Sequence, residues 1–62
     1  MEDPFYSQDE ASPYIRTPPA TMQWWRHKGR GPAYVKIGRR VFYRRSALDA
    51  FVAAGEVQPE MA

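Results

Sequence analysis

The chain has 62 residues, 44% of them hydrophobic, and a formal net charge of +2, so we expect one domain with a single small core. Because it has no cysteine and one histidine, a disulfide framework, a thiolate metal site and an all-histidine metal site are excluded. No apolar run approaches the roughly 18 residues that cross a bilayer, and the acidic N-terminus is unlike a secretory or transit signal, which indicates action inside a cell.

Residues 1–4 show neither a helical nor an alternating pattern, and we expect them to form a loose end. Ser7 followed by Glu10 has the spacing of a capping box, which predicts that a helix begins at this point. Its apolar residues fall on one face at helical spacing: Ala11, Tyr14 and Ile15. Phe5 is expected to fold back onto that face. Pro13 removes a backbone hydrogen bond and clashes with the preceding turn, so this helix should be short or kinked.

The Thr-Pro-Pro segment at 17–19 predicts that the first helix ends and a second helix begins here. Residues before proline avoid the helical region, whereas proline suits the first turn of a helix. We therefore expect a second helix from about Pro19 to Lys28, closed by Gly29 as its C-cap. Met22 and Trp25 share one side of this helix and should turn inward.

The pattern changes from helical to alternating after the flexible connector 29–32. Two strands are expected, Tyr34–Ile37 and Val41–Arg44, joined by a turn at 38–40. They form a hairpin with two arginines at or near its tip.

The length of this turn decides the register of the hairpin. A three-residue turn places Ile37 opposite Val41 and Val35 opposite Tyr43, which gives one apolar face. A two-residue turn places Ile37 opposite Arg40 and mixes charge into that face. We therefore favour the three-residue turn.

A third helix is expected after the hairpin. Ser46 and Asp49 have capping-box spacing, and the helix should end before Gly55. Its apolar stripe consists of Leu48, Phe51 and Val52. Residues 1–55 thus make up the expected domain, and 56–62 a tail that frays.

The order of two helices, a hairpin and a third helix predicts an α+β fold, mostly α, of the small winged helix-turn-helix kind. In this architecture the second helix fits a DNA major groove about 12 Å wide, and the hairpin reaches the flanking phosphates or minor groove.

The net charge conceals an uneven distribution. Residues 1–25 contain one basic and four acidic residues, and residues 46–62 contain three acidic residues and no basic one. The segment between them has eight basic residues and no acidic one: Arg26, Lys28, Arg30, Lys36, Arg39, Arg40, Arg44 and Arg45. Such a block attracts polyanions, but charge alone fits a solvated face equally well.

The outward face of the second helix supplies the candidate base-reading residues. They are Ala20, Thr21, Gln23, Trp24, His27 and Lys28. The Gln23 amide can pair with adenine in a bidentate manner, and Thr21 can bind a base or a phosphate. Trp24 has two interpretations, packing under the hairpin or contact with the sugar-phosphate wall.

The hairpin supplies the candidate phosphate-binding residues. They are Lys36, Gly38, Arg39, Arg40 and Arg44. Charge at a hairpin tip also has the ordinary role of keeping strands soluble. We favour phosphate contact because no acidic residue of the segment neutralises this cluster.

Catalysis has little support in the sequence. Asp9 and Glu10 suit the first turn of a helix, Ser7 and Ser46 suit caps, and no nucleophile-base pair, phosphate-cradling loop or metal spacing is present. We expect no enzyme and no cofactor.

The run from Gly31 to Phe51 resembles the wing and following helix of small MerR-like winged-helix proteins, among them phage excisionases and AlpA-type regulators. The segments 10–11 and 21–29 are similar to the helix-turn-helix of that family, so the likeness covers about residues 5–55. Three positions depart from its usual pattern: Pro13, Thr17 and Ala47. The resemblance implies that the second helix enters the major groove and that the loop 38–40 touches the minor groove or its phosphates.

Since no long dimerisation helix follows the hairpin, the bare domain is most similar to the excisionases, or recombination directionality factors. The resemblance then implies a bacteriophage protein in the cytoplasm of a bacterial host. It would bind tandem sites on double-stranded DNA beside copies of itself, bend the DNA and direct an integrase towards prophage excision. A small AlpA-type or MerR-like transcription regulator is the alternative. A module whose basic face binds an acidic protein is a third hypothesis.

Overall fold

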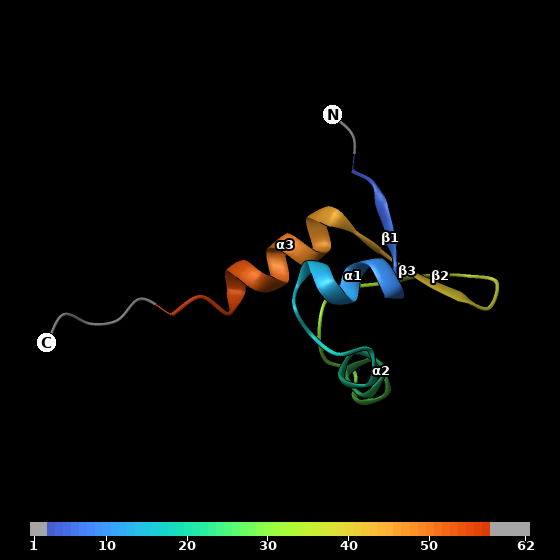
Figure 1. Ribbon diagram of the computed structural model, residues 1–62, viewed down its shortest axis with the longest axis horizontal. Helices are drawn as coiled ribbons and strands as arrows, with labels where there is room; N and C mark the ends of the chain where they lie inside the picture. Colours follow the sequence, from blue (N-terminus) through green and yellow to red (C-terminus); the bar gives the residue numbers. More distant parts are fainter. Residues whose placement is uncertain (1–2, 58–62) are drawn as a thin grey trace, which may run out of the picture.

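The computed structural model describes residues 3–57 and contains three helices and one three-stranded sheet. In chain order the elements are β1 (Phe5–Ser7), α1 (Gln8–Tyr14), α2 (Pro19–Lys28), β2 (Val35–Ile37), β3 (Arg40–Arg44) and α3 (Arg45–Ala54). The sheet is antiparallel in the order β1-β3-β2, with the β2–β3 hairpin projecting away from the helices (Figure 1). This is the α+β winged helix-turn-helix architecture expected from the sequence, with one additional strand.

The additional strand corrects the expectation that Phe5 folds back onto the first helix, and residues 3 and 4 are held by contacts with α3 instead of forming part of a loose end. Phe5 pairs with Arg44, and the pairing continues to Ser7 opposite Phe42. The Pro4 carbonyl accepts a hydrogen bond of 3.0 Å from the Arg45 amide, which extends the ladder by one contact. Three residues are too few to show an alternating pattern, so nothing in the sequence separated this strand from a frayed end. Met1 and Glu2 lie outside the described residues.

The predicted start and the short length of the first helix are both confirmed. The Ser7 hydroxyl accepts from the Glu10 amide at 3.2 Å, and the Glu10 carboxylate accepts from the Ser7 amide at 2.9 Å. After seven residues the helix ends in a left-handed residue, Arg16, at φ 53°. The Thr17 amide then donates to the Ser12 carbonyl at 2.9 Å, which closes the turn in the manner of a Schellman motif.

The second helix has the predicted bounds. Pro19 occupies its first turn, and Gly29 closes it in the left-handed conformation at φ 71°. The Arg30 amide donates to the Trp25 carbonyl at 2.7 Å, which satisfies one of the last helical carbonyls.

The core lies where α1, α2 and α3 meet one face of the sheet. Its fully buried side chains are Ala11, Met22, Tyr43 and Leu48. Partly buried residues pack around them: Tyr6, Ile15, Trp25 and Val41. Met22 and Trp25 turn inward as predicted, whereas Tyr14 remains 44% exposed on the rim of its expected face.

The hairpin register differs from the prediction. The turn has two residues, Gly38 and Arg39, and Ile37 pairs with Arg40. Gly38 has φ 62°, the positive value that a two-residue hairpin loop with glycine first requires. The predicted register, in which the apolar residues of both strands share one buried face, is therefore wrong. Val41 and Tyr43 face the core, whereas Val35 and Ile37 belong to the opposite face of the sheet, which no helix covers. Because that face is open to solvent, pairing of Ile37 with Arg40 buries no charge.

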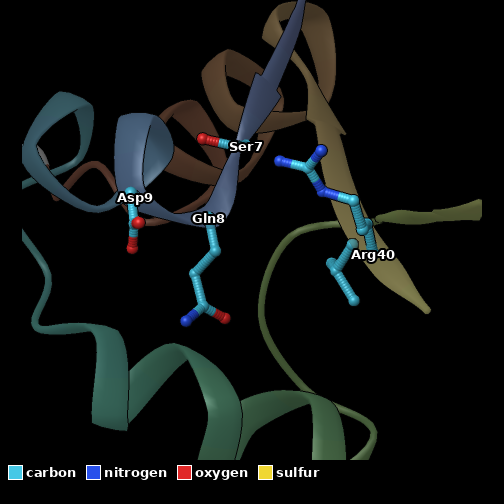
Figure 2. Close-up of a pocket in the computed structure, with 5 residues that line it drawn as sticks. Ser7, Gln8, Asp9 and Arg40 are labelled. Carbon is cyan, nitrogen blue, oxygen red and sulfur yellow. The ribbon is translucent and has the colours of Figure 1, made fainter.

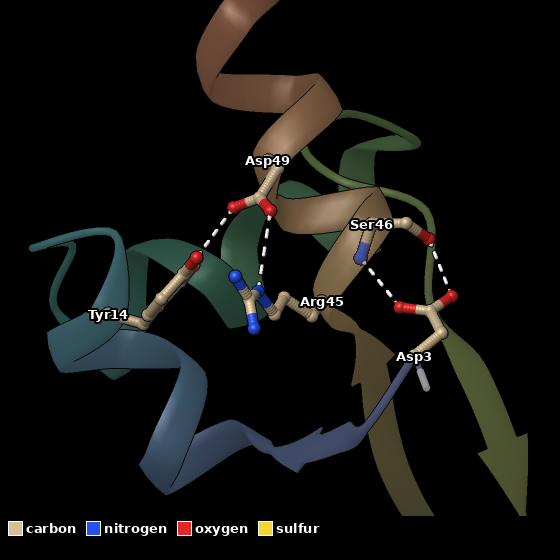
Figure 3. A network of polar contacts seen from close by, with 5 residues as sticks. All are labelled: Asp3, Tyr14, Arg45, Ser46 and Asp49. Atoms are coloured by element: carbon tan, nitrogen blue, oxygen red, sulfur yellow. Dashed lines mark hydrogen bonds and ion pairs between the residues drawn. The ribbon is translucent and has the colours of Figure 1, made fainter. Parts of the chain in front are cut away.

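The cap of the third helix also differs from the prediction. Ser46 is the second residue of α3 and does not cap it. The Asp3 carboxylate accepts from the Ser46 amide at 2.9 Å and from its hydroxyl at 2.7 Å (Figure 3). Asp49 accepts a hydrogen bond of 2.6 Å from the Tyr14 hydroxyl and lies 3.7 Å from Arg45 Nε. A carboxylate from the N-terminal segment thus caps α3, and Asp49 ties α3 to α1.

The helix ends at Ala54, and the part of the expected tail at 58–62 lies outside the described residues. Within residues 3–57, no helix has the length and apolar character needed to cross a membrane.

Candidate nucleic-acid interface

The outward face of α2 carries the residues that the helical pattern placed there. Ala20, Gln23, His27 and Lys28 are exposed, and Thr21 is half-buried at the start of the helix. Trp24 is 49% exposed, so the interpretation that it packs under the hairpin is wrong. One helical face therefore presents an amide, an indole, an imidazole and an ammonium group to solvent.

The position of this face is set by Trp25 on the other side of the helix. The Trp25 ring packs against the core and against Phe51 of α3, with ring centroids 5.0 Å apart. Gly31 lies directly on the same indole, because a Cβ added at Gly31 would come within 2.8 Å of Trp25 Cε3. The connector after α2 thus runs close over Trp25 and holds the end of the helix.

Arg26 connects α2 to the sheet. Its Nη1 atom donates a hydrogen bond of 2.8 Å to the hydroxyl of buried Tyr43, and its guanidinium carbon lies 5.9 Å from the Tyr34 ring centroid. The basic block therefore includes one arginine that fixes the hairpin relative to α2. Sequence reasoning missed this role because Tyr43 is 17 residues away along the chain.

Strand alternation divides the predicted hairpin residues among three places. Lys36 pairs with Val41, so it belongs to the sheet face that meets α2. Gly38 and Arg39 form the tip. Arg40 and Arg44 belong to the opposite face, so the structure does not bring all five residues together.

Arg30 is a second residue that the sequence analysis left out of the site. It lies in the connector just after α2, and its guanidinium carbon is 5.9 Å from the centroid of the exposed Trp24 ring. A cation over an indole face is an attractive arrangement that also holds the ring in place. Two features of the sequence could have indicated Arg30 as a site residue: it belongs to the basic segment 26–45, and it directly follows Gly29, the C-cap of α2.

A shallow hollow of about 200 Å³ lies between the start of α1 and β3. It is lined by Ser7, Gln8, Asp9, Arg40 and Val41 (Figure 2). The Gln8 side chain extends towards α2, and its Oε1 atom is buried without a hydrogen-bond partner among the described residues. Gln8 thus adds a polar amide beside α2, at a position that the sequence did not single out.

The surface electrostatics favour a polyanion on the α2 side. From Arg26 to Arg45 the chain has no acidic residue. Three of the carboxylates that the structure describes already have partners, since Ser46 binds Asp3, Ser7 binds Glu10, and Tyr14 with Arg45 binds Asp49. The hydrogen bond to Asp49 raises the pKa of the Tyr14 hydroxyl. In these contacts the three carboxylates bind residues at the starts of α1 and α3 and in α1. Arg45, at the end of the basic segment, is the one basic residue among these partners.

A short helix pair whose second helix has an exposed face, joined to a basic hairpin and a third helix, defines a small winged helix-turn-helix domain. The sequence matches the helix-turn-helix domain family over residues 5–56. The chain therefore belongs to this DNA-binding family, which includes excisionase-like proteins. Comparison with curated proteins gave no match, and comparison with solved structures gave none either.

Proposed function

We propose that α2 enters the major groove of double-stranded DNA and that the hairpin tip binds the flanking backbone. The observation that carries this proposal is the exposed face of α2, with Gln23 and Trp24 at its centre and no acidic residue in the surrounding segment. Gln23 is the residue best suited to read a base, because its amide can donate to and accept from adenine at once.

The remaining residues of the site position the helix on the duplex. His27 and Lys28 lie in the last turn of α2 and Arg30 lies in the connector after it, and all three suit phosphate contacts on one side of the groove. Lys36 and Arg39 suit the neighbouring phosphates, with Arg39 at the tip of the hairpin. Thr21 and Ala20 lie at the start of α2, where small side chains allow close approach to a base edge.

Biologically, we propose an excisionase-type role on phage DNA in a bacterial cytoplasm. Copies of the domain would bind adjacent sites, bend the DNA and thereby direct an integrase towards excision. Membership of a family that includes excisionase-like proteins supports this role. The domain would supply no chemistry, and the cost of bending would be offset by phosphate contacts along the array.

DNA binding is tested first by selection of binding sites from random duplexes, followed by titration over a range of salt concentrations. We expect Gln23→Ala to alter the selected sequence. Lys36→Gln combined with Arg39→Gln should weaken specific and random duplexes about equally and reduce the salt slope by about two. If Gln23→Ala also weakened specific and random duplexes alike, that result would contradict this division between helix and hairpin.

The excision role is tested by DNA bending and recombination assays on a phage attachment site with its integrase. We expect the protein to bend the site and to favour excision over integration. Unchanged DNA path and unchanged direction of recombination would overturn the role. A single footprint at a promoter would instead support the transcription regulator.

A further inference from the structure

The sheet has a second face that no helix covers and that has no part in the proposed DNA interface. It is formed by Phe5 and Ser7 of β1, Val35 and Ile37 of β2, and Arg40, Phe42 and Arg44 of β3. We call these seven residues the outer sheet face. Phe5 is 44% exposed and Ile37 is 52% exposed, and Phe42 and Val35 are half-buried.

The composition of this face is unusual for a wet sheet surface. An antiparallel sheet that packs helices on one side carries polar residues on the other. Here four of the seven side chains are apolar. The Ser7 hydroxyl caps α1, and the other two polar side chains are arginines that lie over the aromatic rings. The guanidinium carbon of Arg44 is 4.9 Å from the Phe5 ring centroid, and that of Arg40 is 5.4 Å from the Phe42 centroid. The two phenylalanine rings are in contact, with centroids 6.2 Å apart.

This combination matches protein interfaces better than it matches a duplex surface. Aromatic residues and arginine are the types enriched at the centre of protein interfaces. A duplex offers phosphates to arginine, but its bases are stacked and give Phe5, Phe42 and Ile37 no apolar partner. The face is also on the opposite side of the sheet from Tyr43, the residue that contacts α2 through Arg26, so bound DNA would leave it accessible.

The charge on this face specifies the partner. No carboxylate belongs to the face among the described residues. Asp3 is bound by Ser46, and Asp9 at the start of α1 lines the same hollow as Arg40. A guanidinium stacked on a ring keeps its N–H groups available for a carboxylate. Arg40 and Arg44 are four residues apart on one strand, which separates their Cα atoms by about 13 Å.

We infer that the outer sheet face binds an acidic amphipathic helix of another protein. Two carboxylates two turns apart on a helix are separated by about 10.5 Å, which long side chains can match to Arg40 and Arg44. Apolar residues between those carboxylates would cover Phe5, Phe42 and Ile37, and would complete a second layer on the sheet. This inference stands whether or not the α2 side binds DNA.

The test is an NMR titration of the isotope-labelled full chain with a synthetic amphipathic helix. This probe carries two glutamates two turns apart with leucines between them, and its control has lysines in place of the glutamates. We expect amide shifts confined to β1, β2 and β3 for the glutamate peptide and none for the lysine peptide. Arg40→Gln combined with Arg44→Gln should weaken binding roughly three- to tenfold, the loss expected for two exposed ion pairs.

A matched control comes from the same hairpin. Lys36→Gln combined with Arg39→Gln removes the same charge from the α2 side and the tip, and should leave peptide binding within about twofold. Absence of shifts with the glutamate peptide overturns the inference. Shifts of the outer face caused by duplex DNA, or by protein concentration alone, also overturn it, because the occupant would then be nucleic acid or a second copy of this chain.

Discussion

The Arg26 guanidinium donates a 2.8 Å hydrogen bond to the hydroxyl of Tyr43, and this contact joins α2 to β3, the central strand of the sheet. Tyr43 is 1% exposed, so its hydroxyl has little access to water as an alternative partner. The relative orientation of α2 and the hairpin depends on this contact.

Tyr43→Phe removes the hydroxyl and keeps the ring. We expect the free energy of unfolding to fall by about 1.5–3 kcal/mol, the usual contribution of a hydrogen bond to a charged group. The measurement is urea unfolding of Tyr43→Phe, Arg26→Met and the double variant. Single effects that simply add, within about 0.3 kcal/mol, would show that the two side chains do not stabilise each other.

Gly31→Ala tests the close approach of the connector to Trp25. The added methyl group would lie 2.8 Å from Cε3 of the packed Trp25 ring and 2.9 Å from Trp25 Cβ. We expect a loss of about 2–4 kcal/mol, from overpacking together with the positive φ of 86°. Thermal and urea unfolding measure the loss.

Gly29→Ala is the matched control for that variant. Gly29 has a similar φ of 71° but nothing within 4 Å of an added Cβ, so only the backbone cost of about 1 kcal/mol applies. Equal losses at Gly29 and Gly31 would mean that Trp25 moves aside without cost.

Arg16→Gly is expected to stabilise the protein. Arg16 closes α1 at φ 53°, a conformation that costs a residue with a Cβ about 1 kcal/mol and costs glycine almost nothing. After allowance for the greater freedom of glycine in the unfolded chain, we expect a gain of roughly 0.5 kcal/mol in unfolding free energy. Arg16→Ala should show no gain, because it keeps the strained backbone. If Arg16→Ala stabilised the protein as much as Arg16→Gly, the gain would come from loss of the arginine charge and not from relief of backbone strain.

Acid should weaken the cap that Asp3 provides for α3. The hydrogen bonds from the Ser46 hydroxyl and amide hold the pKa of Asp3 below its ordinary value of 3.8. A carboxyl group whose pKa is lowered by folding stabilises the fold above its unfolded pKa, and this contribution is lost as the pH falls through the folded pKa. We therefore expect Asp3→Ala to lower Tm at neutral pH and to have no effect in strong acid.

The measurement is Tm across the range from neutral to strongly acidic pH, with Glu56→Ala as a control carboxylate beyond the end of α3. If the Tm difference between Asp3→Ala and the parent chain were the same at every pH, Asp3 would stabilise the fold through packing and not through its ionised carboxylate.

Local signals in the sequence predicted the helices well. The Ser7 and Glu10 pair, the proline at 19 and the glycine at 29 each act on neighbouring backbone, so their consequences do not depend on the rest of the fold. The exposed face of α2 could be predicted for the same reason, because burial of Met22 and Trp25 fixes where Gln23 and Lys28 point.

The sheet was less predictable because its contacts join distant residues. The register of the hairpin depends on which face of the sheet the helices cover. That face is fixed by the packing of Tyr43 against residues of all three helices, which are distant from it in the sequence. Ser46 has the sequence signature of a cap, yet Asp3 supplies the cap from 43 residues away. The same register places Lys36 on one face of the sheet and Arg40 and Arg44 on the other. The sequence therefore could not show which of the predicted phosphate-binding residues lie together.

Pairing of β1 with β3 has a consequence for the order of events during synthesis. Residues 3–7 contact residues 42–46, which are made near the end of the domain. A nascent chain can form α1 and α2 early, but the sheet closes only after β3 has left the ribosome, since long-range strand pairs must await both partners. The domain therefore acquires its stability in one late step, and fusions placed directly before Asp3 would burden that step.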